Sequence, residues 1–85
     1  MTMRIITIQG EQYVTLTQAA ACYEVEVGWV QQVYDHGLLG EGEEVDEGIA
    51  ILASMLDRLA EIQRLHNQQG VNLNGIAIIL DLLGR

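Results

Sequence analysis

Two short helical segments about four residues apart constrain the fold of this chain more than any other feature. The first, residues 18–23, is rich in alanine and follows Thr17, which we expect to be its N-cap. The second begins near Val27 and runs to His36, with apolar residues at helical spacing and Gly37 positioned to end it in the left-handed conformation. The arrangement predicts a helix-turn-helix.

A short β-hairpin is predicted before these helices. Residues 3–8 are β-branched and apolar, residues 9–11 have the chemistry of a turn, and residues 13–16 return to β-forming side chains. After the second helix, Leu38 and Leu39 are expected to turn back into the core. Residues 40–48 are then expected to form a loop, because their like charges resist compaction. The acidic side chains of this loop are Glu41, Glu43, Glu44, Asp46 and Glu47.

Two further helices are predicted in the second half of the chain. Apolar residues recur at helical spacing from Ile49 to about residue 68 and oppose a charged face. Gly70 is expected to end this helix, and Asn72 to cap a last helix over residues 73–83. With 85 residues, the chain is predicted to be a single domain, 1–85, with a mainly α fold.

The last helix also predicts self-association, because it is apolar nearly all round and a core this small covers only part of it. A chain of this length buries only about 60–65% of its unfolded surface, so a partner adds stability. We therefore expect a homodimer. Its interface is predicted to include Ile76, Ile78, Ile79, Leu82 and Leu83.

The charge of the chain limits its partners and its compartment. Four arginines, no lysine and twelve acidic residues give a formal net charge of -8. Proteins bind phosphates through Lys and Arg, so we expect no or weak affinity for nucleic acid and partners that are neutral or basic. The N-terminal residues lack a signal peptide, and no apolar segment is long enough to span a membrane. We expect a cytoplasmic protein.

No residue set predicts catalysis or a bound cofactor. A nucleophile beside a base is not apparent, so we do not expect an enzyme. The single cysteine, Cys22, is predicted to be a small buried apolar residue of the alanine-rich helix. His36 lies at a helix C-terminus, where a structural role is expected, and His66 has no other ligand at metal-binding spacing. We therefore expect no metal and no cofactor.

Residues 16–27, followed by the Gly-Leu-Leu of residues 37–39, resemble the winged helix-turn-helix of MerR-type regulators. Those regulators carry basic residues in the second helix, before the Gly-Leu-Leu and in the wing. Here residues 40–48 are acidic, and the second helix has these side chains instead: Gln31, Gln32, Asp35 and His36. The resemblance implies a MerR-like scaffold that has lost the cations that would neutralise phosphates.

Within that superfamily, the chain resembles the CbpM-type chaperone modulators. Three segments carry this resemblance, and together they span almost the whole chain: residues 4–11, the Gly-Leu-Leu of 37–39, and residues 65–83. The resemblance implies a noncatalytic modulator. Such a protein binds the J-domain of a DnaJ-like co-chaperone and restrains its stimulation of Hsp70.

An acidic surface is complementary to a basic helix of a J-domain, so the carboxylates are expected to bind the partner, with Trp29 or Tyr34 as an apolar anchor. Core packing is the alternative role for Trp29. The predicted partner-binding residues are Trp29, Tyr34, Asp35, Glu41, Glu43, Glu44, Asp46 and Glu47. The alternative function is that of a MerR-type DNA-binding transcription regulator, which the helix spacing favours and the charge opposes.

Overall fold

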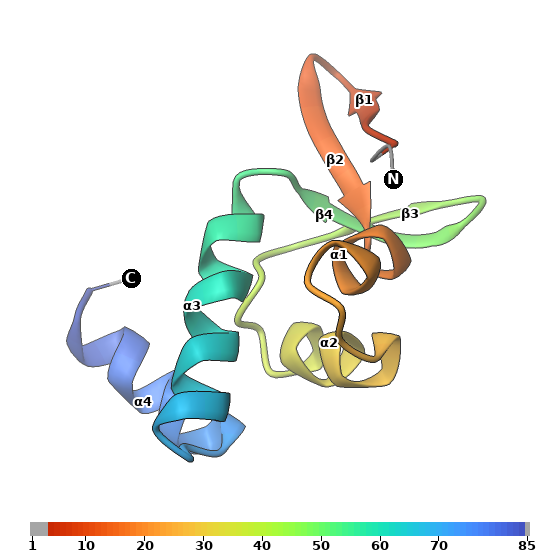
Figure 1. Ribbon diagram of the computed structural model, residues 1–85. Coiled ribbons are helices and arrows are strands. Elements are labelled where there is room, and N and C mark those ends of the chain that lie inside the picture. The colour runs from red at the N-terminus through yellow and green to blue at the C-terminus, as the bar shows by residue number, and fades with distance from the viewer. Residues whose placement is uncertain (1–3, 85) are drawn as a thin grey trace.

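The computed structural model describes residues 4–84, which form four helices and a four-stranded antiparallel sheet (Figure 1). The elements in chain order are β1 (Ile6–Ile8), β2 (Glu11–Thr15), α1 (Leu16–Cys22), α2 (Val27–Asp35), β3 (Glu43–Val45), β4 (Gly48–Leu52), α3 (Met55–Gln68) and α4 (Leu73–Leu82). The strands lie in the order β1-β2-β4-β3. The expectation of a mainly α fold with one hairpin is therefore corrected to helices packed on a full sheet.

The N-terminal hairpin is confirmed as β1 and β2. Its two-residue turn is Gln9–Gly10, with φ of 51° and 83°. Positive φ at both positions is typical of a type I′ turn, whose twist matches that of the flanking strands. β2 also pairs with β4, placing Val14 opposite Ile51. The hairpin is therefore one half of the sheet.

Strands β3 and β4 correct two expectations. Residues 43–45 form a strand inside the segment expected to be a loop, and residues 48–52 form a strand where a helix was expected to begin. β4 lies between β2 and β3, and its interior residues Ala50 and Ile51 are buried. A short apolar run of this kind has no periodicity that distinguishes a central strand from a helix. The helix begins only at Met55. We call residues 41–48 the acidic wing.

The helix-turn-helix is confirmed as α1 and α2, but the N-cap of α1 is not Thr17. The Oγ1 of Thr15 accepts a hydrogen bond from the Gln18 backbone N–H at 3.1 Å, so the helix begins two residues earlier. Gly37 ends α2 with φ of 76°. The backbone N–H of Leu38 then donates to the carbonyl of Val33, which completes a Schellman motif and turns the chain into the core.

Cys22 is exposed, so its expected burial is wrong. The buried face of α1 consists of Leu16, Ala19 and Ala20, which follow i, i+3, i+4 spacing. Cys22 lies two positions beyond Ala20, which corresponds to roughly 200° of rotation about the helix axis. Since it is also three positions beyond Ala19, and so about 60° from that residue, the thiol lies beside the buried stripe rather than within it.

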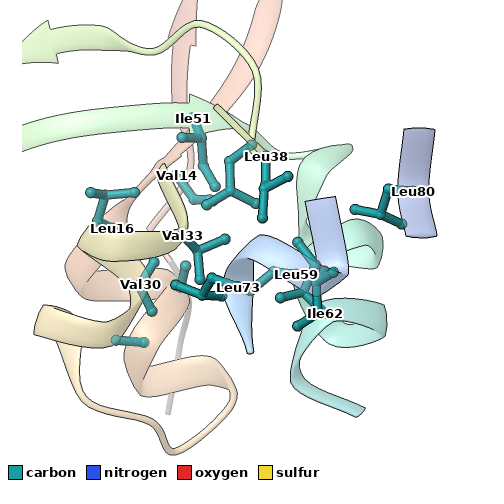
Figure 2. Close-up of a cluster of buried hydrophobic side chains, with 14 residues drawn as sticks. Val14, Leu16, Val30, Val33, Leu38, Ile51, Leu59, Ile62, Leu73 and Leu80 are labelled. Atoms are coloured by element: carbon teal, nitrogen blue, oxygen red, sulfur yellow. The ribbon is translucent and has the colours of Figure 1, made fainter. Parts of the chain in front are cut away.

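The sheet and the helices contribute to one apolar core (Figure 2). The sheet supplies Val14 and Ile51, and the Leu38–Leu39 pair is buried as expected. Side chains from the helices complete it: Leu16, Val30, Val33, Leu59, Ile62, Leu73, Ile76 and Leu80. Within residues 4–84, no helix is long and apolar enough to cross a bilayer.

The predicted boundary between the last two helices is confirmed. Gly70 follows α3 with φ of 66°, and the Oδ1 of Asn72 accepts a hydrogen bond from the Gly75 backbone N–H at 2.8 Å. Asn72 is thus the N-cap of α4. α4 packs beside α3 on the side of the molecule away from the wing (Figure 1).

Candidate partner-binding surfaces

The acidic wing extends away from the helices at one edge of the sheet (Figure 1). All five of its acidic side chains are exposed: Glu41, Glu43, Glu44, Asp46 and Glu47. Arg4 Nη1 lies 3.6 Å from Glu47 Oε1, and both side chains are exposed, so this pair contributes little. The other four carboxylates have no ion-pair partner in the described part of the chain. The wing therefore presents a concentrated negative potential to solvent.

The exposed face of α2 lacks a cation as well. Asp35 is exposed and its Oδ1 accepts a hydrogen bond from Gln31 Nε2 at 3.0 Å, while His36 Nδ1 lies 2.8 Å from the Gln32 carbonyl oxygen. Elsewhere, Arg58 Nη1 lies 3.5 Å from the Leu38 carbonyl oxygen and Arg64 Nη2 lies 4.0 Å from Glu61 Oε2. The helix and the wing with which a winged helix-turn-helix meets DNA thus carry carboxylates and no Lys or Arg of their own.

Tyr34 is half-buried, and its hydroxyl accepts a hydrogen bond from the Gly42 backbone N–H at 3.1 Å. This bond joins the C-terminal end of α2 to the start of the acidic wing. The structure therefore brings Tyr34 close to the wing, as the predicted binding surface required. Its hydroxyl has a structural partner within the chain.

Trp29 lies apart from the wing. Its half-buried ring is tilted by 38° against the ring of His66 from α3, with centroids 5.5 Å apart. Its Nε1 is the one buried side-chain nitrogen or oxygen without a hydrogen-bond partner among residues 4–84. Such a group is uncommon, because an unsatisfied buried donor costs about 1–3 kcal/mol.

Two hollows meet at the Trp29–His66 pair, and neither includes a wing residue. The first, of about 280 Å³, is lined by Glu24, Val25, Glu26, Trp29, Gln63, His66 and Asn67. The second, of about 440 Å³, is lined by Trp29, Gln32, His36, His66, Asn72, Leu73 and Asn74. The predicted partner-binding set therefore separates into two places, the wing with Tyr34 and the hollows at Trp29.

Sequence reasoning missed the residues that surround Trp29. Glu24 and Glu26 lie in the turn between α1 and α2, and their spacing could have indicated a second acidic position near the only tryptophan of the sequence. His66 and Gln63 come from α3, more than thirty residues after Trp29 in the chain. Only the packing of α3 against the helix-turn-helix brings them to the same hollow.

The predicted dimer residues divide between the core and the surface of α4. Ile76 is 0% exposed and belongs to the core, so it is not available to a partner, which corrects its assignment to an interface. Ile79 is half-buried. Ile78, Leu82 and Leu83 are 61%, 80% and 60% exposed. We call these three residues the α4 patch.

The described residues include no group of three His, Cys, Asp or Glu side chains able to hold a metal ion. Burial, together with the nearby Cys22 and Asp57, raises the pKa of the Tyr23 phenol. The Tyr23 hydroxyl donates to the Leu56 carbonyl at 2.9 Å and so holds the helix-turn-helix against α3. These contacts give Tyr23 a structural role.

The comparison with protein families agrees with this geometry. A family model described as MerR HTH family regulatory protein matches residues 14–85, which include the helix-turn-helix, the wing, α3 and α4. No curated protein and no solved structure matches the chain significantly. Because the match covers most of the chain, the protein belongs to the MerR helix-turn-helix family of regulatory proteins.

Proposed function

We propose that this protein is a noncatalytic modulator that binds the J-domain of a DnaJ-like co-chaperone in the cytoplasm and restrains its stimulation of Hsp70. One observation carries the proposal: the helix and the wing that contact DNA in a winged helix-turn-helix are here acidic. The resemblance of residues 65–83 to CbpM-type modulators supports the choice of a J-domain as the partner.

Electrostatics favours a protein partner over DNA. A protein gains affinity for duplex DNA by placing Lys and Arg against phosphates and releasing counterions, with nonspecific dissociation constants of about 10⁻⁴–10⁻⁶ M. Five exposed carboxylates in the acidic wing oppose this approach. The same carboxylates attract a basic helix of another protein, chiefly by raising the association rate.

A DNA-binding transcription regulator is the second candidate. Membership of the MerR family and the intact helix-turn-helix favour it. In that case α2 would enter the major groove, where the exposed Gln32 could contact adenine. The absence of Lys and Arg from α2 and from the wing opposes this candidate.

The two candidates are separated by a triple charge reversal in the wing, Glu43→Lys, Glu44→Lys and Asp46→Lys. We expect the wild type to bind an isolated J-domain with an association rate that falls as salt rises, and the triple variant to associate more slowly. It should also relieve the inhibition of J-stimulated ATP hydrolysis by Hsp70. Stopped-flow association and an ATPase assay measure these effects.

The matched control reverses three exposed carboxylates on other elements, Glu11→Lys, Asp57→Lys and Asp81→Lys, which changes the net charge equally. This control should retain most of the association rate. If the control slows association and the wing variant does not, the partner contacts a surface that carries at least one of these three carboxylates instead of the wing. Submicromolar retention of random duplex DNA by the wild type in a gel shift would favour the transcription regulator.

A further inference from the structure

The hollow of about 280 Å³ beside Trp29 lies between the turn that precedes α2 and the C-terminal part of α3. Pockets for drug-sized ligands occupy about 300–1,000 Å³, so this hollow has room for one side chain rather than a large ligand. Its lining combines the rings of Trp29 and His66 and one valine with polar and acidic groups, of which Glu24, Glu26 and Asn67 are exposed. That composition favours a polar, positively charged occupant.

The two carboxylates of the hollow are not used by the fold. Glu24 and Glu26 have no ion pair among residues 4–84, and the Glu26 side chain does not cap α2 although it occupies the N-cap position. Glu24 also has a left-handed backbone with φ of 55°, which is unusual for a residue other than glycine or asparagine. Strain of this kind often occurs at functional sites.

The aromatic side of the hollow is held by packing. His66 Nδ1 lies 3.2 Å from the Val71 carbonyl oxygen, which fixes the imidazole against which Trp29 is tilted. Nε1 of Trp29 has no hydrogen-bond partner among the described residues, so packing rather than a hydrogen bond positions the indole. Gln63 donates its amide N–H to the Tyr23 carbonyl at 3.4 Å, and the oxygen of that amide is an acceptor for a cation.

We propose that this hollow receives an arginine side chain of a protein partner, with its guanidinium against the Trp29 ring and its N–H groups donating to Glu24 and Glu26. Arginine fits better than lysine, because a planar guanidinium stacks on an aromatic face, forms bidentate bonds with carboxylates and is weakly hydrated. The inference rests on the proposed function in one respect, since it assumes a protein partner with basic side chains. It gives that partner a second contact, separate from the acidic wing.

Trp29 is the only tryptophan, so the intrinsic fluorescence of the protein reports directly on this hollow. The first experiment titrates the full chain with N-acetylarginine amide and, separately, with N-acetylcitrulline amide, its neutral isostere. We expect a saturable change in emission with the arginine compound and none with the citrulline compound. Equal changes with both, or none with either, would overturn the proposal.

Two double variants with the same change of net charge make the test specific to the hollow. Glu24→Asn with Glu26→Gln removes its carboxylates, and asparagine tolerates the left-handed backbone at residue 24. Glu43→Gln with Glu44→Gln removes two carboxylates from the acidic wing instead. We expect the first pair to weaken arginine binding about tenfold or more and the second pair to change it less than about twofold. Circular dichroism checks that both are folded.

Titration of an isolated J-domain with the same variants distinguishes this inference from the proposed function. If the hollow variant loses affinity for both the J-domain and the arginine compound, the inference holds. If the wild type and the hollow variant bind the J-domain equally and the arginine compound gives no saturable change, arginine binding in the hollow is refuted and the proposed function stands. If no variant binds the J-domain, but the change in emission with the arginine compound is lost only in the hollow variant, the proposed function fails and arginine binding in the hollow stands.

Discussion

Gly42 lies where the acidic wing contacts Tyr34 of α2, and a larger residue there would have no room. A Cβ at this position would meet the Ala50 carbonyl oxygen and the Tyr34 hydroxyl at 2.8 Å each, and Ile49 Cγ2 at 2.9 Å. We expect Gly42→Ala to lower the free energy of unfolding by about 1–3 kcal/mol, because the wing must shift away from α2. Urea denaturation measures this change.

The control for this prediction is Gly28→Ala, because a Cβ on Gly28 meets no atom within 4 Å. Gly28 lies in α2, where alanine is the better helix former, so the substitution should be neutral or stabilise the fold by up to about 1 kcal/mol. Equal losses of stability in the two variants would show that the close approach at residue 42 does not constrain the wing.

At the scale of single residues, sequence reasoning succeeds where one side chain decides the outcome. The left-handed Gly37 and the Asn72 cap are such cases, since each acts within one turn of its own helix. It fails between near-equivalent residues. Thr15 and Thr17 both precede helical sequence, and only the pairing of β2 with β4 determines which of them leaves the strand as the cap.

Helix α4 has a buried face and an exposed face, and single substitutions on each face test this difference. Ile76 is 0% exposed and Ile78 is 61% exposed, although they are two residues apart. We expect Ile76→Ala to lower the free energy of unfolding by about 2–5 kcal/mol and Ile78→Ala by less than about 0.5 kcal/mol in the monomer. Denaturation at low protein concentration measures both. A larger loss for Ile78→Ala would mean that α4 packs with the opposite face.

Elements were predictable where the apolar pattern has a clear period. The helical spacing of apolar residues predicts α3, which the structure shows from Met55 onward. The β-forming side chains on both sides of a turn predict the hairpin of β1 and β2. The strand Gly48–Leu52 was not predictable in this way, because its position inside the sheet depends on pairing with β2, which is distant in sequence. The candidate site follows the same rule. The charge of the acidic wing was visible in the sequence, whereas the meeting of Trp29 with α3 depends on tertiary packing.

At the scale of the whole molecule, three surfaces lie on different parts of one small domain. The acidic wing lies at an edge of the sheet, the Trp29 hollow lies between α2 and α3, and the α4 patch lies on the last helix. The patch includes no residue of the other two surfaces, so self-association through α4 does not require their residues. A dimer would then present two wings and two hollows.

We propose that the protein forms a homodimer through the α4 patch, Ile78, Leu82 and Leu83. Complete burial of such a side chain contributes about 1.5–3 kcal/mol, and the six side chains of a two-fold interface, already partly covered, would contribute about 6–12 kcal/mol in all. Association costs about 4–15 kcal/mol, so the balance is close. The expected dimer is therefore concentration-dependent, with monomer prevailing on dilution.

Sedimentation across a range of concentrations tests the proposed dimer. The double variant with Ile78→Asp and Leu82→Asp should be a monomer that binds the J-domain as the wild type does. The control is Gln12→Asp with Thr17→Asp, which adds the same charge at exposed positions on β2 and α1 and should leave the dimer intact. The wild type should pass from monomer to dimer as concentration rises, because the interface is small and apolar. A wild type that stays monomeric at high micromolar concentration would mean that the exposed leucines and isoleucine of α4 do not mediate self-association.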